Sequence, residues 1–159
     1  MRDAREEDLS ALLEIYNEAV LSSPATFDLE PNTLGARRKW FLKHGGKYPL
    51  VIAQVGAKVA GYCCISPYAE KPGYARTVDL SVYVHRDYRR KGIATVLMKE
   101  IIVRAGTLGH HAIVSSITGS NSESARLHVK MGFEFRGYLS QLGYKFGRWH
   151  DVALYELIL

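Results

Sequence analysis

Cysteine is scarce in this sequence: the chain of 159 residues has two, and they are adjacent, Cys63 and Cys64. Neighbouring side chains on a strand point to opposite faces, and a disulfide between neighbours needs strained geometry. Neither the cysteines nor the six histidines have the spacing of a metal site. We therefore expect two buried free thiols in the reducing cytoplasm, and no metal.

Long apolar runs are also missing. No segment approaches the roughly 18 uninterrupted apolar residues of a membrane span. The charged start, Met1–Asp8, lacks the apolar stretch of a secretion signal. With 47% hydrophobic and 23% charged residues, the composition is that of globular domains and excludes a disordered or collagen-like chain. The length predicts one domain, residues 1–159, and we expect no membrane partner.

The charge is only moderately unbalanced. Lysine and arginine number 21 against 16 acidic residues, a net charge of +5, and the densest basic cluster lies in Arg86–Lys91. A nucleic-acid stripe would be longer and interleaved with aromatic residues, so we expect no nucleic-acid partner. The cluster suits a small polyanion such as a phosphorylated cofactor, although charge alone favours a solvated loop.

The apolar pattern predicts an α+β chain. Helical spacing alternates with β-branched and alternating stretches, and turn residues separate them. One mixed sheet with helices on both faces, an α/β sandwich, is the expected arrangement. The expected strands are Met1–Asp3, Leu50–Val55, Lys58–Ile65, Thr77–Val84, Ala112–Ile117, Glu134–Leu142 and His150–Leu159, and the last two flank a Gly143–Gly147 turn. The expected helices are Glu6–Val20, Gly92–Leu108 and Ser122–Met131, and a further helix that is capped by Asn32 or Thr33 and reaches about His44.

The basic loop between the strand Thr77–Val84 and the helix from Gly92 is the most informative segment. The first N–H groups of a helix have no internal partner and carry partial positive charge. Small residues at Gly92 and Ala94 allow a ligand to approach the backbone closely. This pattern is typical of a phosphate or pyrophosphate site, and an ordinary capped helix explains it equally well. Walker A, GxGxxG and GxSxG motifs are absent, which makes a serine hydrolase unexpected.

The segment Arg89-Arg90-Lys91-Gly92-Ile93-Ala94 resembles the [QR]-x-x-G-x-[GA] motif of the GNAT acetyltransferases. Its resemblance extends over almost the whole chain, from Ile15-Tyr16-Asn17 to the hairpin Gly143–Asp151. That hairpin is similar to the G-[FY]-K-x-G-x-W-x-D pattern of the phosphinothricin and amino-acid N-acetyltransferase subgroup. The resemblance implies the GNAT acyl-CoA N-acyltransferase fold: a mixed, mostly antiparallel sheet with a splayed parallel pair.

The same resemblance implies acetyl-CoA as co-substrate. A backbone amide of Val82 or Val84 would polarise the thioester carbonyl, and the amides from Arg90 to Thr95 would hold the pyrophosphate. Asn121 would contact the pantetheine, with Ser124 nearby, although Asn121 also suits a plain helix cap. The implied cofactor-binding residues are Val82, Tyr83, Val84, Arg89, Arg90, Lys91, Gly92, Ile93, Ala94, Thr95, Asn121 and Ser124.

Two residues are implied as catalytic. Asp79 stands where the resembling enzymes have a glutamate base; it is one methylene shorter and would reach the amine through a water. Its free pKa, about 3.9, makes it a weak base unless the pocket raises that value, and the alternative is a hydrogen bond to a neighbouring backbone group. His128 would protonate the departing thiolate or only contact CoA; otherwise it is a packed helix residue.

The acceptor site is the least defined. By resemblance it uses Phe27, Tyr74, Arg76 and Thr77, together with the hairpin, and Arg76 would pair with a substrate carboxylate unless it is a plain surface arginine. Tyr74-Ala75-Arg76 departs from the usual subgroup pattern, which leaves the acceptor open. The resemblance also implies a homodimer, and the hairpin aromatics Tyr144, Phe146 and Trp149 suit such an interface or, equally, a core.

We therefore expect a cytoplasmic N-acetyltransferase that moves acetyl from acetyl-CoA to the primary amine of a small amino acid or analogue. Phosphinothricin and methionine sulfoximine represent the implied acceptor class. Attack would be direct, in a ternary complex without an acyl-enzyme. The alternatives are a catalytically inactive CoA-binding sensor and an acetyltransferase acting on a protein N-terminus or a polyamine.

Overall fold

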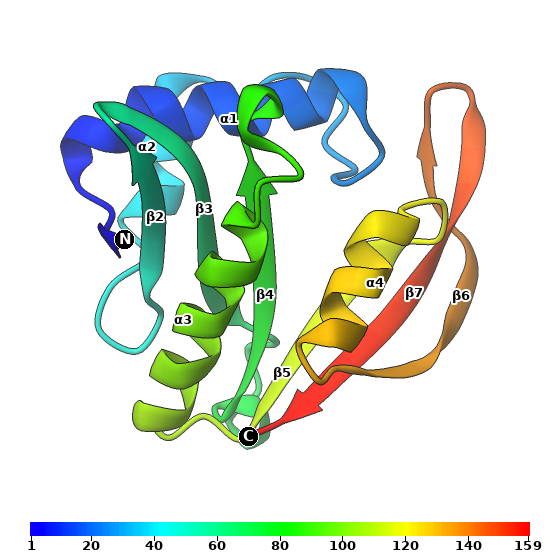
Figure 1. Ribbon diagram of the computed structural model, residues 1–159. Helices are drawn as coiled ribbons and strands as arrows, with labels where there is room; N and C mark the ends of the chain where they lie inside the picture. The colour runs from blue at the N-terminus through cyan, green and yellow to red at the C-terminus, as the bar shows by residue number, and fades with distance from the viewer.

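The computed structural model describes all 159 residues, and its centre is one seven-stranded sheet in the order β1-β2-β3-β4-β5-β7-β6 (Figure 1). Neighbouring strands are antiparallel except β4 and β5, which are parallel. The predicted mixed sheet is thus confirmed. The strands are β1 (Arg2–Asp3), β2 (Leu50–Val55), β3 (Lys58–Pro67), β4 (Thr77–Val84), β5 (Ala112–Thr118), β6 (Glu134–Lys145) and β7 (Arg148–Ile158).

Helices cover both faces of this sheet (Figure 1). The helices α1 and α2 pack on one face, and α3 and α4 lie on the other. None of them is long and apolar enough to cross a membrane. The helices are α1 (Leu9–Ser22), α2 (Leu34–Phe41), α3 (Ile93–Thr107) and α4 (Ser122–Lys130), with short 3₁₀ turns η1 (Glu6–Asp8), η2 (Pro72–Tyr74) and η3 (Arg86–Tyr88).

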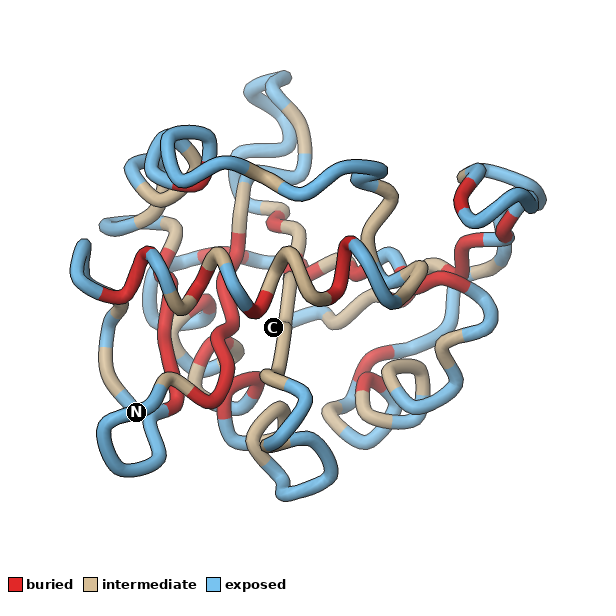
Figure 2. Tube along the Cα trace, turned by 90° about the horizontal axis from the view of Figure 1, so that it is seen from above, coloured by how far each residue is buried: buried red, intermediate tan, exposed pale blue.

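The alternation of side chains along the strands divides the core in two. Cys63 belongs to the cluster under α3 and Cys64 to the cluster under α1, and both thiols are free and buried. This confirms the opposite orientation expected for neighbours on a strand. The buried residues of α1 recur along one side of the helix, as Figure 2 shows, so its apolar stripe faces the sheet.

Most predicted boundaries shift by one to three residues, and two of these differences have a visible cause in the backbone. The helix α2 ends at Phe41 rather than His44, because the chain turns at Gly45 and Gly46, both at positive φ. The last hairpin has only Phe146 and Gly147 between its strands, at φ 53 and 73. Two successive residues at positive φ make the tight turn that matches strand twist, so the strands run further than the sequence indicated.

The parallel strands β4 and β5 separate soon after they begin. They pair at three positions only, from Thr77↔Ala112 to Asp79↔Val114. Beyond these pairs β4 stays with β3 as far as Val84, while β5 follows β7 as far as Thr118. The sheet therefore opens toward α1 and the start of α4 (Figure 1).

Candidate active site

A cleft of about 540 Å³ lies where β4 and β5 diverge. Its walls come from α1, the end of β4, the basic loop and the first turns of α3 and α4. It brings together every residue predicted to bind the cofactor except Lys91. The Lys91 ammonium instead donates to the carbonyl of Asp87 at 2.9 Å, outside the cleft.

The backbone of the basic loop presents free donors to this cleft. Arg90 and Gly92 adopt positive φ, 59 and 79, and Gly92 caps α3 without a side chain. The first loop-to-helix bond runs from the amide of Val96 to the carbonyl of Gly92, at 3.2 Å. The amides that precede Val96 in α3 have no helical acceptor, and the helix dipole adds positive potential there. These unpaired amides form a cradle of positive potential that fits a diphosphate.

Arg89 lines the cleft, and two contacts hold its guanidinium. Its Nε donates to the carbonyl of Val84 at 3.2 Å, and Nη2 is paired with Glu18 of α1. These contacts tie the loop to both β4 and α1. The pairing was not predictable from the sequence, because Glu18 and Arg89 lie 71 residues apart. Arg89 thus holds the basic loop against β4 and α1, where these elements form the wall of the cleft.

The cleft continues into a cavity of about 70 Å³ between β4 and β5, lined by Ser115, Asn121, Ser124 and His128 among others. Asn121 caps α4, since its Oδ1 accepts from the amide of Ser124 at 3.1 Å. The carbonyl of Ser124 lies 2.8 Å from Nδ1 of His128 and can only accept, so Nδ1 carries the hydrogen.

The remaining nitrogen of His128, Nε2, is buried without a partner, as is the hydroxyl of Ser115. Burial lowers the pKa of His128, which favours the neutral ring. In that ring Nε2 holds a lone pair and accepts rather than donates. The predicted transfer of a proton from His128 to the thiolate therefore needs a charged ring that its surroundings disfavour.

Asp79 sits at the last position where β4 and β5 pair. Its carboxylate is half-buried and makes neither a hydrogen bond nor an ion pair, so the structure does not support the alternative of a backbone partner. Burial raises the pKa of Asp79 to about 6. A carboxylate with that pKa is largely ionised at pH 7 yet is a far stronger base than a free aspartate.

The hairpin reaches over the loop between α1 and α2. The half-buried ring of Phe27 packs against Gly143, and the buried Lys145 donates from Nζ to the carbonyl of Thr26 at 2.8 Å. Burial lowers the pKa of Lys145. These contacts fix the loop on the same face of the sheet as Asp79. The lysine of the hairpin pattern was the signal in the sequence, although its partner was not visible there.

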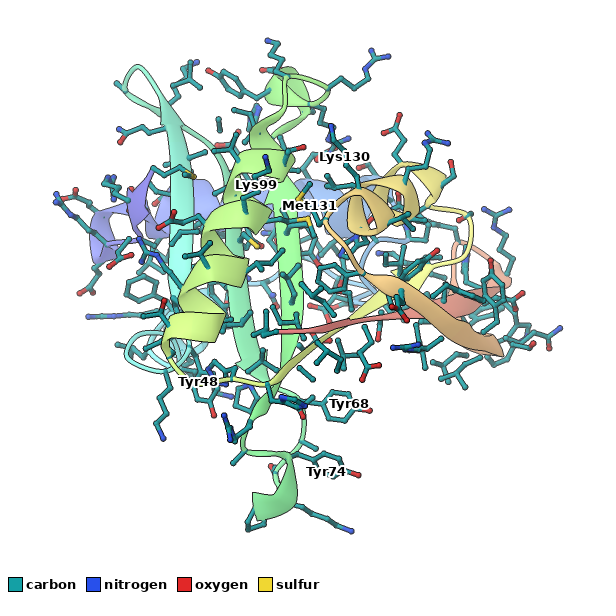
Figure 3. The ribbon with its side chains drawn as sticks, turned by 60° about the horizontal axis from the view of Figure 1, so that its bottom comes forward. Tyr48, Tyr68, Tyr74, Lys99, Lys130 and Met131 are labelled. Atoms are coloured by element: carbon teal, nitrogen blue, oxygen red, sulfur yellow. The ribbon has the colours of Figure 1, made fainter.

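The other residues predicted for the acceptor lie apart from the cofactor cleft. Arg76 donates from Nε to the carbonyl of Gly109 at 2.9 Å, beside His111 and the end of α3. Tyr74 contacts Tyr68 edge-to-face at 5.5 Å, and both project from the β3–β4 connection at the bottom of the sheet (Figure 3). Only Thr77, two residues from Asp79 on β4, shares its face of the sheet.

Comparisons with known proteins agree with this geometry. Residues 12–133 match the family described as Acetyltransferase (GNAT) family. The chain is 38% identical, over its full length and 94% of the relative, to an L-methionine sulfoximine/L-methionine sulfone acetyltransferase of Pseudomonas aeruginosa. It is 39% identical to a phosphinothricin N-acetyltransferase of Streptomyces coelicolor, over 98% of this chain and 94% of that one.

A solved structure extends the comparison to the fold. The crystal structure of a GNAT superfamily phosphinothricin acetyltransferase from Sinorhizobium meliloti, in complex with AcCoA, superposes with a TM-score of 0.96 at 34% identity. The match covers 99% of this chain and 86% of that one. The fold is thus shared with a protein that was crystallised with AcCoA.

Proposed function

Because the chain belongs to the GNAT acetyltransferase family, we propose that it transfers the acetyl group of acetyl-CoA to the primary amine of a small amino acid or analogue. Acceptors resembling phosphinothricin or methionine sulfoximine fit the names of its relatives. One observation carries the proposal: an amide cradle for a diphosphate and an unpaired carboxylate, Asp79, flank the same opening in the sheet.

The residues of the cleft fit acetyl-CoA. The unpaired amides at the start of α3 suit the diphosphate, and the groove between β4 and β5 suits the extended pantetheine arm. In an antiparallel strand alternate residues turn their backbone groups to opposite sides. On the free side of β4 an amide of Val82 or Val84 can therefore donate to the thioester carbonyl and stabilise the oxyanion of the attack.

Asp79 serves as the base, because an amine attacks only in its neutral form. An α-amine is mostly protonated at pH 7, so the carboxylate must take a proton before the C–N bond forms. The shorter side chain of aspartate favours one water between the carboxylate and the amine. The nitrogen then attacks the thioester directly, the C–S bond breaks, and CoA leaves as a thiolate that takes up the second proton of the nitrogen to become the thiol. Cys63 and Cys64 are buried away from this opening and form no acyl-enzyme.

Other features of the structure support a single domain, a cytoplasmic location and a homodimer. All strands join one sheet, in keeping with a single domain, and the two free thiols accord with the cytoplasm. The hairpin exposes the side chains of Tyr144, Phe146 and Trp149, which suits a homodimer interface. The expected absence of metal, nucleic-acid and membrane partners stays a prediction.

A thiol-release screen with acetyl-CoA tests the proposal. Amino acids and their analogues should release CoA, with methionine sulfoximine and phosphinothricin among the better acceptors. Release only with polyamines or peptide N-termini would overturn the assigned acceptor. Tight acetyl-CoA binding with no release for any amine would favour the CoA-binding sensor.

A further inference from the structure

The proposed reaction leaves a proton behind. At neutral pH an ammonium ion and a thioester give an amide, a thiol and one proton, so each turnover must export a proton to solvent. The first group to hold that proton is Asp79. The carboxylate has no hydrogen-bond partner, and it stands at the closed end of the opening between β4 and β5, which bound substrates would fill. A route to solvent by another side is therefore needed.

Ser66 is the neighbour of Asp79 across the sheet. The two residues are register partners on β3 and β4 and project from the same face. Side chains at such positions have Cβ atoms about 5 Å apart, a gap that a direct contact or one water bridges. Ser66 is half-buried, and its hydroxyl both donates and accepts.

His44 continues the path. Its Nε2 lies 3.3 Å from Oγ of Ser66, and its Nδ1 lies 2.9 Å from the carbonyl of Trp40. The carbonyl can only accept, so Nδ1 carries the hydrogen and Nε2 is the acceptor for the Ser66 hydroxyl. Every group from Asp79 to His44 thus has the polarity that passes a proton outward.

The far end of this path opens to solvent. His44 lines a second cleft, of about 490 Å³, together with residues of the β1 and β2 edge and the end of α3. This cleft shares no lining residue with the acetyl-CoA cleft. Acetyl-CoA in the first cleft therefore leaves the second cleft open.

From this geometry we infer that Ser66 and His44 are positioning residues that carry the acceptor's proton from Asp79 to solvent. The inference rests on the proposed function. Protonated Asp79 gives its proton to Oγ of Ser66, directly or through one water, while the Ser66 hydroxyl proton moves to Nε2 of His44. Nε2 of the imidazolium then releases that proton to water of the second cleft, and Nδ1 keeps its hydrogen bond to the Trp40 carbonyl. Ser66 and His44 then return to their starting forms.

The charges around His44 favour its neutral form at rest. Burial lowers the pKa of His44, and the nearby cations Arg37 and Lys43 lower it further, against the opposing effect of the Trp40 carbonyl. Asp3 and Arg104 line the same cleft but are paired with each other. A neutral imidazole is ready to accept a proton.

Chemical rescue gives the sharpest test. His44→Ala should lower kcat about tenfold with KM for both substrates unchanged, since a relay contributes part of the general acid–base effect. Added imidazole, which fits the cleft that His44 lines, should restore the rate. His111→Ala, at an exposed histidine, is the matched control and should neither lose activity nor respond to imidazole. A loss at His44→Ala that imidazole does not restore would overturn the inference.

Ser66 variants keep the test independent of how well His44→Ala folds. Ser66→Ala should lower kcat by a similar factor, and Ser66→Thr, which retains the hydroxyl, should restore it. Equal activity in the alanine and threonine variants would contradict the relay. Asp79→Asn separates the proposed base from the proposed relay. A fully active Asp79→Asn would overturn the assignment of Asp79 as the base. An inactive Asp79→Asn, together with fully active Ser66 and His44 variants, would overturn the relay alone.

Discussion

The ring of Phe27, in the loop after α1, lies against the backbone of Gly143 in β6, so that a Cβ at Gly143 would overlap three ring carbons. Glycine is thus required at this point of the hairpin by a residue 116 positions earlier, since 143 − 27 = 116. The contact couples the loop between α1 and α2 to the projecting hairpin.

Gly143→Ala should therefore destabilise the protein and weaken acceptor binding. The added methyl group must displace the Phe27 ring, and such overpacking costs about 1–3 kcal/mol. Urea unfolding and the KM for the amino acid measure the two effects. Gly106→Ala, in α3 with open space around it, is the control and should be neutral or slightly stabilising. An unchanged KM in Gly143→Ala would show that the loop position does not affect the acceptor.

Asp79→Asn should lower kcat by about 10²–10⁴-fold, because the amide cannot take the proton of the amine. Acetyl-CoA affinity should be retained, since the cradle lies in the loop before α3. In the wild type, kcat/KM should fall as pH drops below about 6, the pKa of Asp79. Kinetics across pH, with calorimetric titration of acetyl-CoA, check both points. Loss of acetyl-CoA binding in the variant would point to a structural role instead.

The same carboxylate predicts a pH dependence of stability. The pKa of Asp79 is raised from 3.8 to about 6 on folding, so the folded state binds the proton more tightly. Its favourable contribution is complete below pH 3.8 and is lost as pH rises through 6. As pH rises from 3.8 to 6, the free energy of unfolding of Asp79→Asn should therefore increase relative to that of the wild type. The expected increase is about 1–2 kcal/mol, after allowance for the partial exposure of Asp79. Denaturant melts at about pH 4, near the lower end of this range, and at about pH 7.5, above its upper end, measure the difference. An equal difference at both would contradict the raised pKa.

His128 should be neutral at pH 7, with its hydrogen on Nδ1. The Ser124 carbonyl fixes this tautomer, and burial lowers the pKa of the ring. Long-range proton–nitrogen NMR of histidine-labelled protein distinguishes the two ring nitrogens directly. A charged ring in the acetyl-CoA complex at neutral pH would restore the role of His128 as an acid.

Much of the fold was predictable because local patterns determine it. The strand Thr77–Val84 was predicted with its observed limits from alternating apolar residues, and the start of α3 at Gly92 was predicted from one glycine at a strand-to-helix loop. The choice of Asp79 as the candidate base came from resemblance, and the structure adds the burial that raises its pKa.

The remainder depends on contacts between distant segments. Arg76 turns to the end of α3, and Arg89 to α1, because the tertiary arrangement offers each an acceptor there. His44 meets Ser66 only once a loop and a strand are placed side by side. No periodicity or spacing in the sequence encodes such pairs.

The three residue pairs that join β4 to β5 are a short seam for a sheet of this width. On one side stand β1 to β4 with α1 to α3, and on the other β5 to β7 with α4 (Figure 1). Away from the seam, the bond from Lys145 to Thr26 and another from Thr118 to Pro24 bridge the two sides. The backbone thus joins the two halves only along this seam, while one buried apolar cluster packs across it, and Asp79 stands at the last pair before the strands part.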